Sequence, residues 1–396
     1  MGTAQFAPDF SLLLNGQPAP TELRASIQAL ECKTGYEGLD EVECTLANDR
    51  LRWLDSTLFA LGTGITLSLG YAPEPLTQVF DGEVVARAAT FPAGGAPAFS
   101  ITAHDRRHKM ATGNKLRWFA IPLPGLNLPL PDPVTAGIVT LENLMVPVFD
   151  PVGFALSVLL GGIDAFAALD PISSQKVIRK QANTSDYEFL QQLAQENGWD
   201  LLVEHAGTLG GHMLRFTSSL DHVRPDHTLR YGSSLIDFSP RVSTVGQIGS
   251  VSGFIWVPPI KMTFIVTLGF DFERMALTLS IYPGIVPFGM QPSDYLIEEP
   301  LTLTSIPRRL VSELLPKLNN RLTASGSIVG NAQLRAGDVL RIEGVGQEFG
   351  GLYRTTAVTH SLDSGGFRTR FEARKEIWFG SIPPADQGAV PVRVTL

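Results

Sequence analysis

Histidines are the first residues of this chain whose types and spacing could do chemistry. His104 and His108, in the run HDRRH, lie four positions apart, a spacing at which two imidazoles on a helix can share a metal ion. No glutamate lies between them as in a zinc protease signature, and Arg106 and Arg107 would repel a cation. We therefore interpret this run as a solvated strand end.

The other five histidines indicate no catalytic arrangement. His205 and His212 flank the glycine-rich turn GTLGG, and His222 and His227 lie in a polar loop, so all four are interpreted as surface residues. His360 falls in the middle of a predicted strand, where we expect a packed or hydrogen-bonded sheet residue.

Motifs for nucleophilic or phosphate chemistry are missing from the sequence. There is no G-x-S-x-G elbow and no G-x-x-x-x-G-K loop, and strands rather than a helix flank the glycines of 344–351. Neighbouring carboxylates occur at Glu298 and Glu299 and at Asp40 and Glu41, but such pairs are common on surfaces. The sequence thus predicts a protein that is not an enzyme, with no catalytic residue, no cofactor and no metal ligand.

Charge and cysteine content limit the partners and the compartment. The 396 residues carry 31 Lys plus Arg against 39 Asp plus Glu, and no basic run is long enough to follow a phosphate backbone, so we expect no nucleic-acid recognition. Cys32 and Cys44 are interpreted as buried small hydrophobic residues in a reducing compartment. The N-terminal residues lack the pattern of a signal peptide, which favours a product that stays in the cytoplasm where it is made.

The elements that would position any site are mostly strands. From residue 9 to about residue 104 hydrophobic residues recur with a period of two, clearest in ITLSLGY at 65–71, which argues for a sandwich or small barrel. Two strongly apolar segments, 144–162 and 275–290, contain prolines that make a membrane span unfavourable, so we expect them to be buried or at subunit interfaces.

Two helices are predicted. NTSDYEFLQQLAQENGW, 183–199, begins with a capping box of Ser185 and Glu188 and ends at Gly198. Its buried face is predicted to comprise Tyr187, Phe189, Leu190 and Leu193. The second helix, 307–322, has leucines at helical spacing at positions 310, 314, 318 and 322, and Pro316 should kink or split it.

The order of these pieces resembles the phage late control D family, the baseplate hub proteins of contractile tails and injection systems, related to the hub part of the type VI secretion spike. The resemblance is carried by NTSDYEFLQQLAQENGWDLLVE at 183–204, by YGSSLIDFSP at 231–240 and by the C-terminal run 334–376. VFDGEVV at 79–85 and the strand end at 103–105 are similar too.

This resemblance implies a mainly β fold with a few helices, in which two related tube-type β-barrel domains and inserted segments form a trimeric ring with pseudo-six-fold symmetry. The capped helix would then pack on the second barrel. The implied division is a first tube-like domain at 1–118, an apolar Pro-rich insertion at 119–174, a second tube-like domain at 175–257, an apolar insertion at 258–306, a helix with C-terminal barrel strands at 307–378, and a tail at 379–396.

The function that the resemblance implies is structural. A homotrimer would join the inner tube to the central spike, contact other baseplate subunits and enclose a channel, and it would assemble in the cytoplasm into a tail or injection particle. Two alternatives remain open at this stage: a cell-wall hydrolase associated with the hub, and a membrane-interacting component of the same apparatus, although membrane contact of the isolated chain is not expected.

Overall fold

The computed structural model describes residues 7–118, 121–123, 126–130, 180–197, 199–207, 210–217, 222, 224–243, 249–257, 261–271, 276–284, 294–301 and 305–377. These residues form a mainly β protein with a few helices, as predicted. The chain divides into two compact units. Unit 1 comprises Met1–His108, Trp199–Gln247 and Leu318–Val392, and unit 2 comprises Lys109–Gly198, Ile248–Lys317 and Arg393–Leu396.

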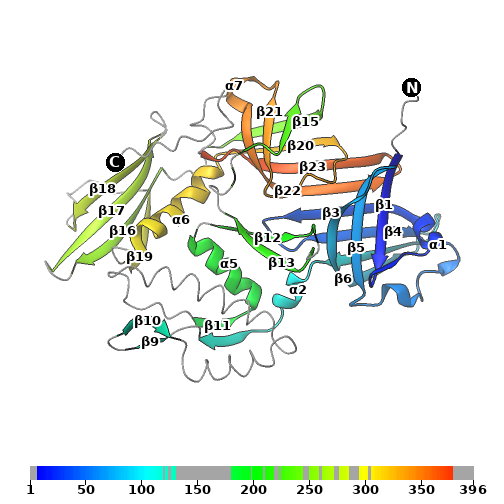
Figure 1. The fold of residues 1–396 in the computed structure, drawn as a ribbon, viewed down its shortest axis with the longest axis horizontal. Helices are drawn as coiled ribbons and strands as arrows, with labels where there is room; N and C mark the ends of the chain where they lie inside the picture. Colours follow the sequence, from blue (N-terminus) through cyan, green and yellow to red (C-terminus); the bar gives the residue numbers. More distant parts are fainter. Residues whose placement is uncertain are drawn as a thin grey trace. The chain divides into compact units, whose positions relative to one another are not determined.

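Unit 1 is built on one large sheet that joins strands from both ends of the chain (Figure 1). Its strand order is β15-β20-β23-β22-β3-β4-β7-β6-β5-β1-β2, and β21 pairs with both β22 and β14. The N-terminal strands are β1 (Ala7–Leu14), β2 (Gln17–Pro18), β3 (Ile27–Gly35), β4 (Glu41–Ala47), β5 (Gly64–Ala72), β6 (Thr77–Thr90) and β7 (Ala98–His104). The later strands are β14 (His227–Arg230), β15 (Leu235–Val242), β20 (Leu322–Val329), β21 (Val339–Glu343), β22 (Gly351–Asp363) and β23 (Gly366–Arg374).

The resemblance implied two tube-type β-barrel domains, and among the described strands no barrel is closed. The junction is β3, which pairs on one side with β4 and on the other with β22, where His360 lies opposite Cys32. Because both edges of β3 are occupied, the N-terminal strands continue into the C-terminal strands instead of closing on themselves. The described strands of the large sheet therefore form an open sheet.

The core of unit 1 lies against the face of the large sheet that carries the alternating hydrophobic side chains. Ile65, Leu67 and Leu69 of β5 are buried together with Phe80 of β6, as the alternation predicts. Cys32 and Cys44 are free thiols within this core, which confirms their prediction as buried small residues. Burial raises the pKa of the Cys44 thiol to about 12, so this group stays protonated at neutral pH.

Short elements complete unit 1. A hairpin of β12 (Asp200–Glu204) and β13 (Met213–Thr217) pairs only with itself among the described strands. The helices and 3-10 turns are α1 (Thr21–Ser26), η1 (Asp49–Leu51), η2 (Thr57–Phe59), α2 (Arg107–Met110), whose last two residues belong to unit 2, and α7 (Gly346–Phe349).

Unit 2 contains a four-stranded sheet of order β18-β17-β16-β19, formed by β16 (Ser250–Val257), β17 (Met262–Asp271), β18 (Ala276–Pro283) and β19 (Tyr295–Leu301). Most described residues of the predicted apolar insertion 258–306 thus form strands. Two small sheets pair β8 (Lys115–Trp118) with β11 (Lys180–Thr184) and β9 (Ile121–Leu123) with β10 (Leu126–Leu130). The rest of insertion 119–174, apart from these strands, and the predicted tail 379–396 lie outside the described residues.

The second predicted helix is α6 (Ser305–Asn319), and it is not split at Pro316. Pro316 lies in the last turn, so the missing N–H removes only the hydrogen bond to the Ser312 carbonyl. Leu310, Leu314 and Leu318 are buried, as their spacing predicts. Leu322, expected at the end of the same helix, instead begins β20, because the helix stops three residues earlier. Among the described residues no helix is both long and apolar enough to cross a bilayer.

Candidate functional site

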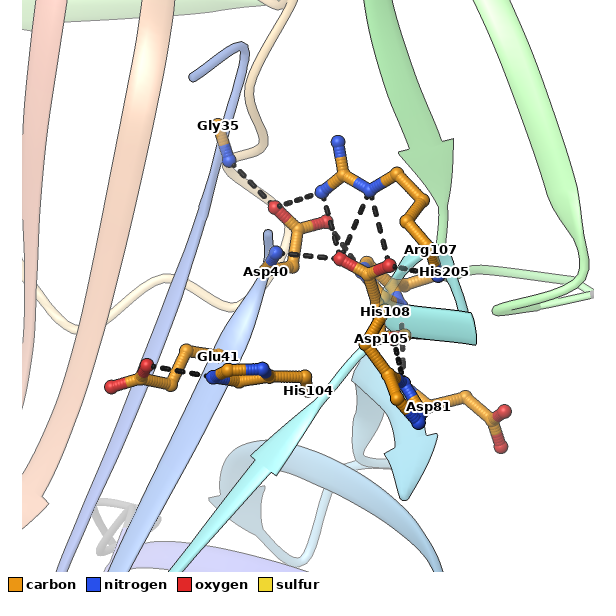
Figure 2. Close-up of polar contacts among 9 residues, drawn as sticks. All are labelled: Gly35, Asp40, Glu41, Asp81, His104, Asp105, Arg107, His108 and His205. Atoms are coloured by element: carbon orange, nitrogen blue, oxygen red, sulfur yellow. Dashed lines mark hydrogen bonds and ion pairs between the residues drawn. The ribbon is translucent and has the colours of Figure 1, made fainter. Parts of the chain in front are cut away.

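A buried network of charged side chains joins three parts of unit 1 that are far apart in sequence (Figure 2). Asp40 lies just before β4, Asp105 and Arg107 follow β7, and His205 follows β12. All four side chains are buried, and Arg107 is only 1% exposed. The run HDRRH is therefore not a solvated strand end, and the interpretation of Asp40 as a surface carboxylate is also wrong.

Arg107 is the centre of this network. Its Nη2 lies 2.8 Å from Oδ2 of Asp105 and 3.1 Å from Oδ1 of Asp40. Its Nε lies 3.1 and 3.0 Å from the two carboxylate oxygens of Asp105. One guanidinium thus bridges two buried carboxylates, an arrangement in which the charge pairing offsets the cost of desolvation.

Backbone groups complete the coordination of both carboxylates. Asp40 accepts a hydrogen bond from the Gly35 N–H at 2.9 Å, and Asp105 accepts from the Asp40 N–H at 2.6 Å. Asp105 also accepts from the Arg107 N–H at 2.7 Å, a contact over two positions that turns the chain out of β7. The carboxylates therefore fix the ends of β3, β4 and β7 relative to one another.

His205 connects the β12–β13 hairpin to this network. Its Nε2 lies 2.8 Å from Oδ2 of Asp40, and its Nδ1 accepts a hydrogen bond from the Asp81 N–H at 3.1 Å. Because a backbone N–H can only donate, these contacts assign a neutral imidazole with its proton on Nε2. The ring also stacks on Phe80, with the centroids 5.3 Å apart.

The prediction of His205 as a surface residue is wrong, and the glycines of the neighbouring turn were the available signal. A Cβ on Gly210 would lie 2.3 Å from the His205 carbonyl oxygen, and one on Gly211 would lie 2.5 Å from Cβ of Asp81. Only glycine allows the turn to approach β6 so closely. His212, on the other side of the turn, is exposed as predicted.

A second charged cluster holds the other end of β12. Nη2 of Arg374 lies 2.6 Å from Oδ2 of Asp200, the first residue of β12, and 3.2 Å from Oε1 of Glu376. Nε of Arg354 lies 2.9 Å from the same Glu376 oxygen. Together with His205, these contacts attach both ends of β12 to the large sheet through ion pairs and hydrogen bonds.

A small pocket of about 40 Å³ lies between the hairpin and the sheet. Its lining includes Asp40, Glu204, His205, Arg335 and His360. A space of this size has room for one or a few water molecules and is far below the usual volume of a substrate site.

The histidines of the sheet behave as structural groups. His360 is buried and its Nδ1 lies 3.0 Å from Oγ1 of Thr369, which confirms the predicted hydrogen-bonded sheet residue. Burial lowers the pKa of His360 to about 4 and keeps the ring neutral at physiological pH. His104 pairs with Glu41 at 3.1 Å at a half-buried position. His227 is also half-buried, and its hydrogen bond to Asp338 raises its pKa.

The role that this arrangement of side chains supports is attachment of the β12–β13 hairpin to the large sheet. The lone pairs of Asp40 and Asp105 are engaged by Arg107, His205 and backbone N–H groups, so neither carboxylate is placed as a general base. In the described parts of the chain no three His, Cys, Asp or Glu side chains are grouped so that they could hold a metal ion.

Five of the residues predicted as structural positions lie in α5 (Asp186–Asn197) of unit 2, and Ser185 directly precedes it. The helix is somewhat shorter than the predicted 183–199. The Ser185 N–H donates to Oε2 of Glu188 at 2.8 Å, and the Glu188 N–H donates to Oγ of Ser185 at 3.2 Å. Hydrogen bonds from the backbone N–H and from the side chain of Ser185 lower the pKa of the Glu188 carboxyl. The buried side chains include Tyr187, Phe189, Leu190 and Leu193. Gly198 lies outside the described residues.

Comparison with known proteins identifies solved structures with a similar fold. No family model matches the sequence, and no curated protein matches it. The tail protein from Neisseria meningitidis MC58 superimposes with a TM-score of 0.55 at 9% identity, covering 93% of this chain and 97% of that chain. The 43 kDa tail protein of prophage MuSo2 from Shewanella oneidensis gives 0.55 at 11% identity, with 93% and 98% covered.

These two matches extend over nearly the whole of each chain. A third, an E. coli component of the type VI secretion system, gives a TM-score of 0.49 at 10% identity over 91% of this chain and 76% of that chain. The fold is therefore that of phage tail proteins. The resemblance predicted from the sequence motifs is confirmed at the level of the fold.

Proposed function

We propose that this chain is the structural hub of a contractile-tail or injection-system baseplate. Three copies surround a common axis, join the inner tube to the central spike, contact other baseplate subunits and enclose the channel. The chain acts by assembly and does no catalysis. It is assembled in the cytoplasm into a particle that leaves the cell as a virion or an extracellular injection device.

The observation that carries this proposal is the match of the fold to tail proteins along nearly the whole length of both chains. A match confined to one domain would leave room for an unrelated activity in the remainder, whereas here 93% of the chain is covered. The sequence motifs at 183–204 and 334–376 point to the hub among tail components. Both supports concern architecture, and the site chemistry agrees with them, because the buried charges bind one another.

The physical need for partners also supports a subunit of a larger assembly. Several large hydrophobic side chains are more than half exposed, among them Leu279, Ile281, Val329 and Trp256. An open sheet also leaves edge strands that must be paired, covered or blocked. Closed rotational symmetry is one way in which copies of a chain cover such surfaces.

The test is the mass of the purified chain, measured by light scattering and by sedimentation over a wide range of concentration. We expect a trimer, alone or after co-expression with a tube protein and a spike protein, and a three-fold ring by electron microscopy. A monomeric mass at every concentration and in the presence of both partners would contradict the proposal. Digestion of cell wall by the purified chain would instead favour the hydrolase alternative.

A further inference from the structure

The four-stranded sheet of unit 2 ends in a strand that differs from the other terminal strands of the two larger sheets among the described residues. β18 has the sequence ALTLSIYP and contains no charged residue. It pairs with β17 on one side, and in the described residues no strand pairs with its other side. Natural sheets usually block such an edge with charge, proline or a short strand, because free backbone groups recruit another strand.

Each of the other terminal strands of the two larger sheets carries such a block. β2 has only two residues, one of them Pro18, and β14 has four, with His227 and Arg230 at its ends. β19, on the opposite side of the same small sheet, contains two neighbouring glutamates followed by Pro300.

The edge at β15 is blocked more specifically. The Ser243 N–H donates to the Arg321 carbonyl at 3.0 Å, so alternate residues 241 and 239 also bond toward β20. The backbone of Pro240 then faces away from β20, and proline has no N–H to offer there. Among these edges β18 alone combines length with lack of charge, and its one proline, Pro283, is its last residue.

The direction of the free backbone groups of β18 follows from the ladder. The Gly284 N–H donates to the Thr263 carbonyl at 2.7 Å, one step beyond the paired residues Phe264 and Pro283. In an antiparallel pair hydrogen-bonded and non-bonded positions alternate, so Ser280 bonds toward β17. The N–H and C=O groups of Leu279 and Ile281 therefore point outward, along the free edge.

The side chains of the same two residues are exposed. Leu279 is 63% and Ile281 is 59% exposed, whereas Leu268 and Val266, their direct neighbours on β17, are buried. The apolar face of the sheet thus continues to its last strand and stops there uncovered. A further strand would pair with the outward backbone and cover the flanks of both side chains.

We infer that the free edge of β18 binds an extended, uncharged segment of a different protein of the particle, which adds a fifth strand to this sheet. A second copy could offer only its own β18, since its other edges are blocked. Pairing of β18 with β18 of a second copy would impose a two-fold axis, and on this point the inference rests on the proposed three-fold hub.

A defined peptide tests the inference with the full-length chain. The probe is a labelled peptide of alternating valine and threonine with lysines at both ends, and binding is followed by fluorescence anisotropy and by hydrogen exchange of residues 276–283. We expect slower exchange in β18 on binding. The substitutions Leu279→Pro, which removes an outward N–H, and Ile281→Lys, which places a charge on the edge, should each weaken binding about tenfold or more.

The matched control is Ser280→Lys, which adds the same charge one position away, where the backbone bonds to β17; its binding should stay close to that of the wild type. No binding up to about millimolar peptide, or equal binding by the three variants, would overturn the inference. So would a dimer in solution that Ile281→Lys dissociates, because β18 would then pair with itself. These outcomes are independent of whether the chain is trimeric, which tests the proposed function separately.

Discussion

Nε2 of His205 lies 2.8 Å from Oδ2 of Asp40, although 165 positions of sequence separate the two residues. Through this contact a hairpin from the middle of the chain is attached to a loop near its N-terminus. Figure 2 shows that Asp40 faces Arg107 with its other oxygen, so the histidine extends an ion pair that is already buried. The position of the hairpin therefore depends on Asp40 and Arg107. These residues are distant in sequence and cannot be inferred from the hairpin alone.

Replacing this histidine should loosen the hairpin. His205→Ala leaves the Asp81 N–H without its acceptor and removes a donor from Asp40, and we expect the free energy of unfolding to fall by about 1–3 kcal/mol. Denaturant titration measures the change, and hydrogen exchange should rise first in residues 200–217. His212→Ala is the control, because His212 is exposed at the other side of the same turn. Equal stability of the two variants would show that the contact contributes little.

Arg107 should be the most sensitive member of the network. Arg107→Met leaves Asp40 and Asp105 buried without their shared cation, and the expected loss is about 3–5 kcal/mol in thermal or chemical unfolding. Arg87→Met removes the same charge from an exposed position and should change stability by less than about 0.5 kcal/mol. A similar small effect at Arg107 would mean that water reaches the two carboxylates.

His360 should make stability depend on acidity. Its pKa in the folded protein is about 4, against 6.5 for an unperturbed histidine, so the unfolded chain binds the proton more readily. Its stabilising effect is complete above pH 6.5 and is lost as the pH falls toward 4, by about 3 kcal/mol in total.

Unfolding measured at several pH values in wild type and in His360→Gln isolates this effect. The raised pKa of His227 has the opposite sign, since its stabilisation is present at low pH and is lost as the pH rises, but it is common to both proteins. The difference between the two proteins should shrink on acidification. A difference independent of pH would rule out a buried neutral imidazole.

The buried face of α5 provides a test of the residues predicted as structural positions. Leu190→Ala should lower stability by about 2–5 kcal/mol, because Leu190 is almost fully buried, and particle formation should fall with it. Gln195→Ala, on the exposed side of the same helix, should leave both unchanged. Wild-type melting and normal assembly of Leu190→Ala would contradict the structural importance of this face.

Features set by neighbouring residues were predictable from the sequence. The reciprocal contacts of Ser185 and Glu188 span three positions, and the alternation of Ile65, Leu67 and Leu69 needs only a pleated strand with one buried face. The end of α6 was predicted less well, because the helix and β20 compete for the same residues and Leu322 pairs with β15. Helix boundaries depend on such tertiary pairing more than helix existence does.

By itself, the sequence determined the kinds of elements, the N-terminal capping box of the central helix, the buried thiols of Cys32 and Cys44 and the likeness to tail proteins. Only the tertiary structure decided that β3 pairs with β22 in one open sheet and that His205, Asp40 and Arg107 meet. The physical reason is the sequence separation over which each kind of interaction acts. Period and capping act over a few positions of the chain, whereas strand pairing and burial of charge depend on which distant segment occupies the neighbouring space.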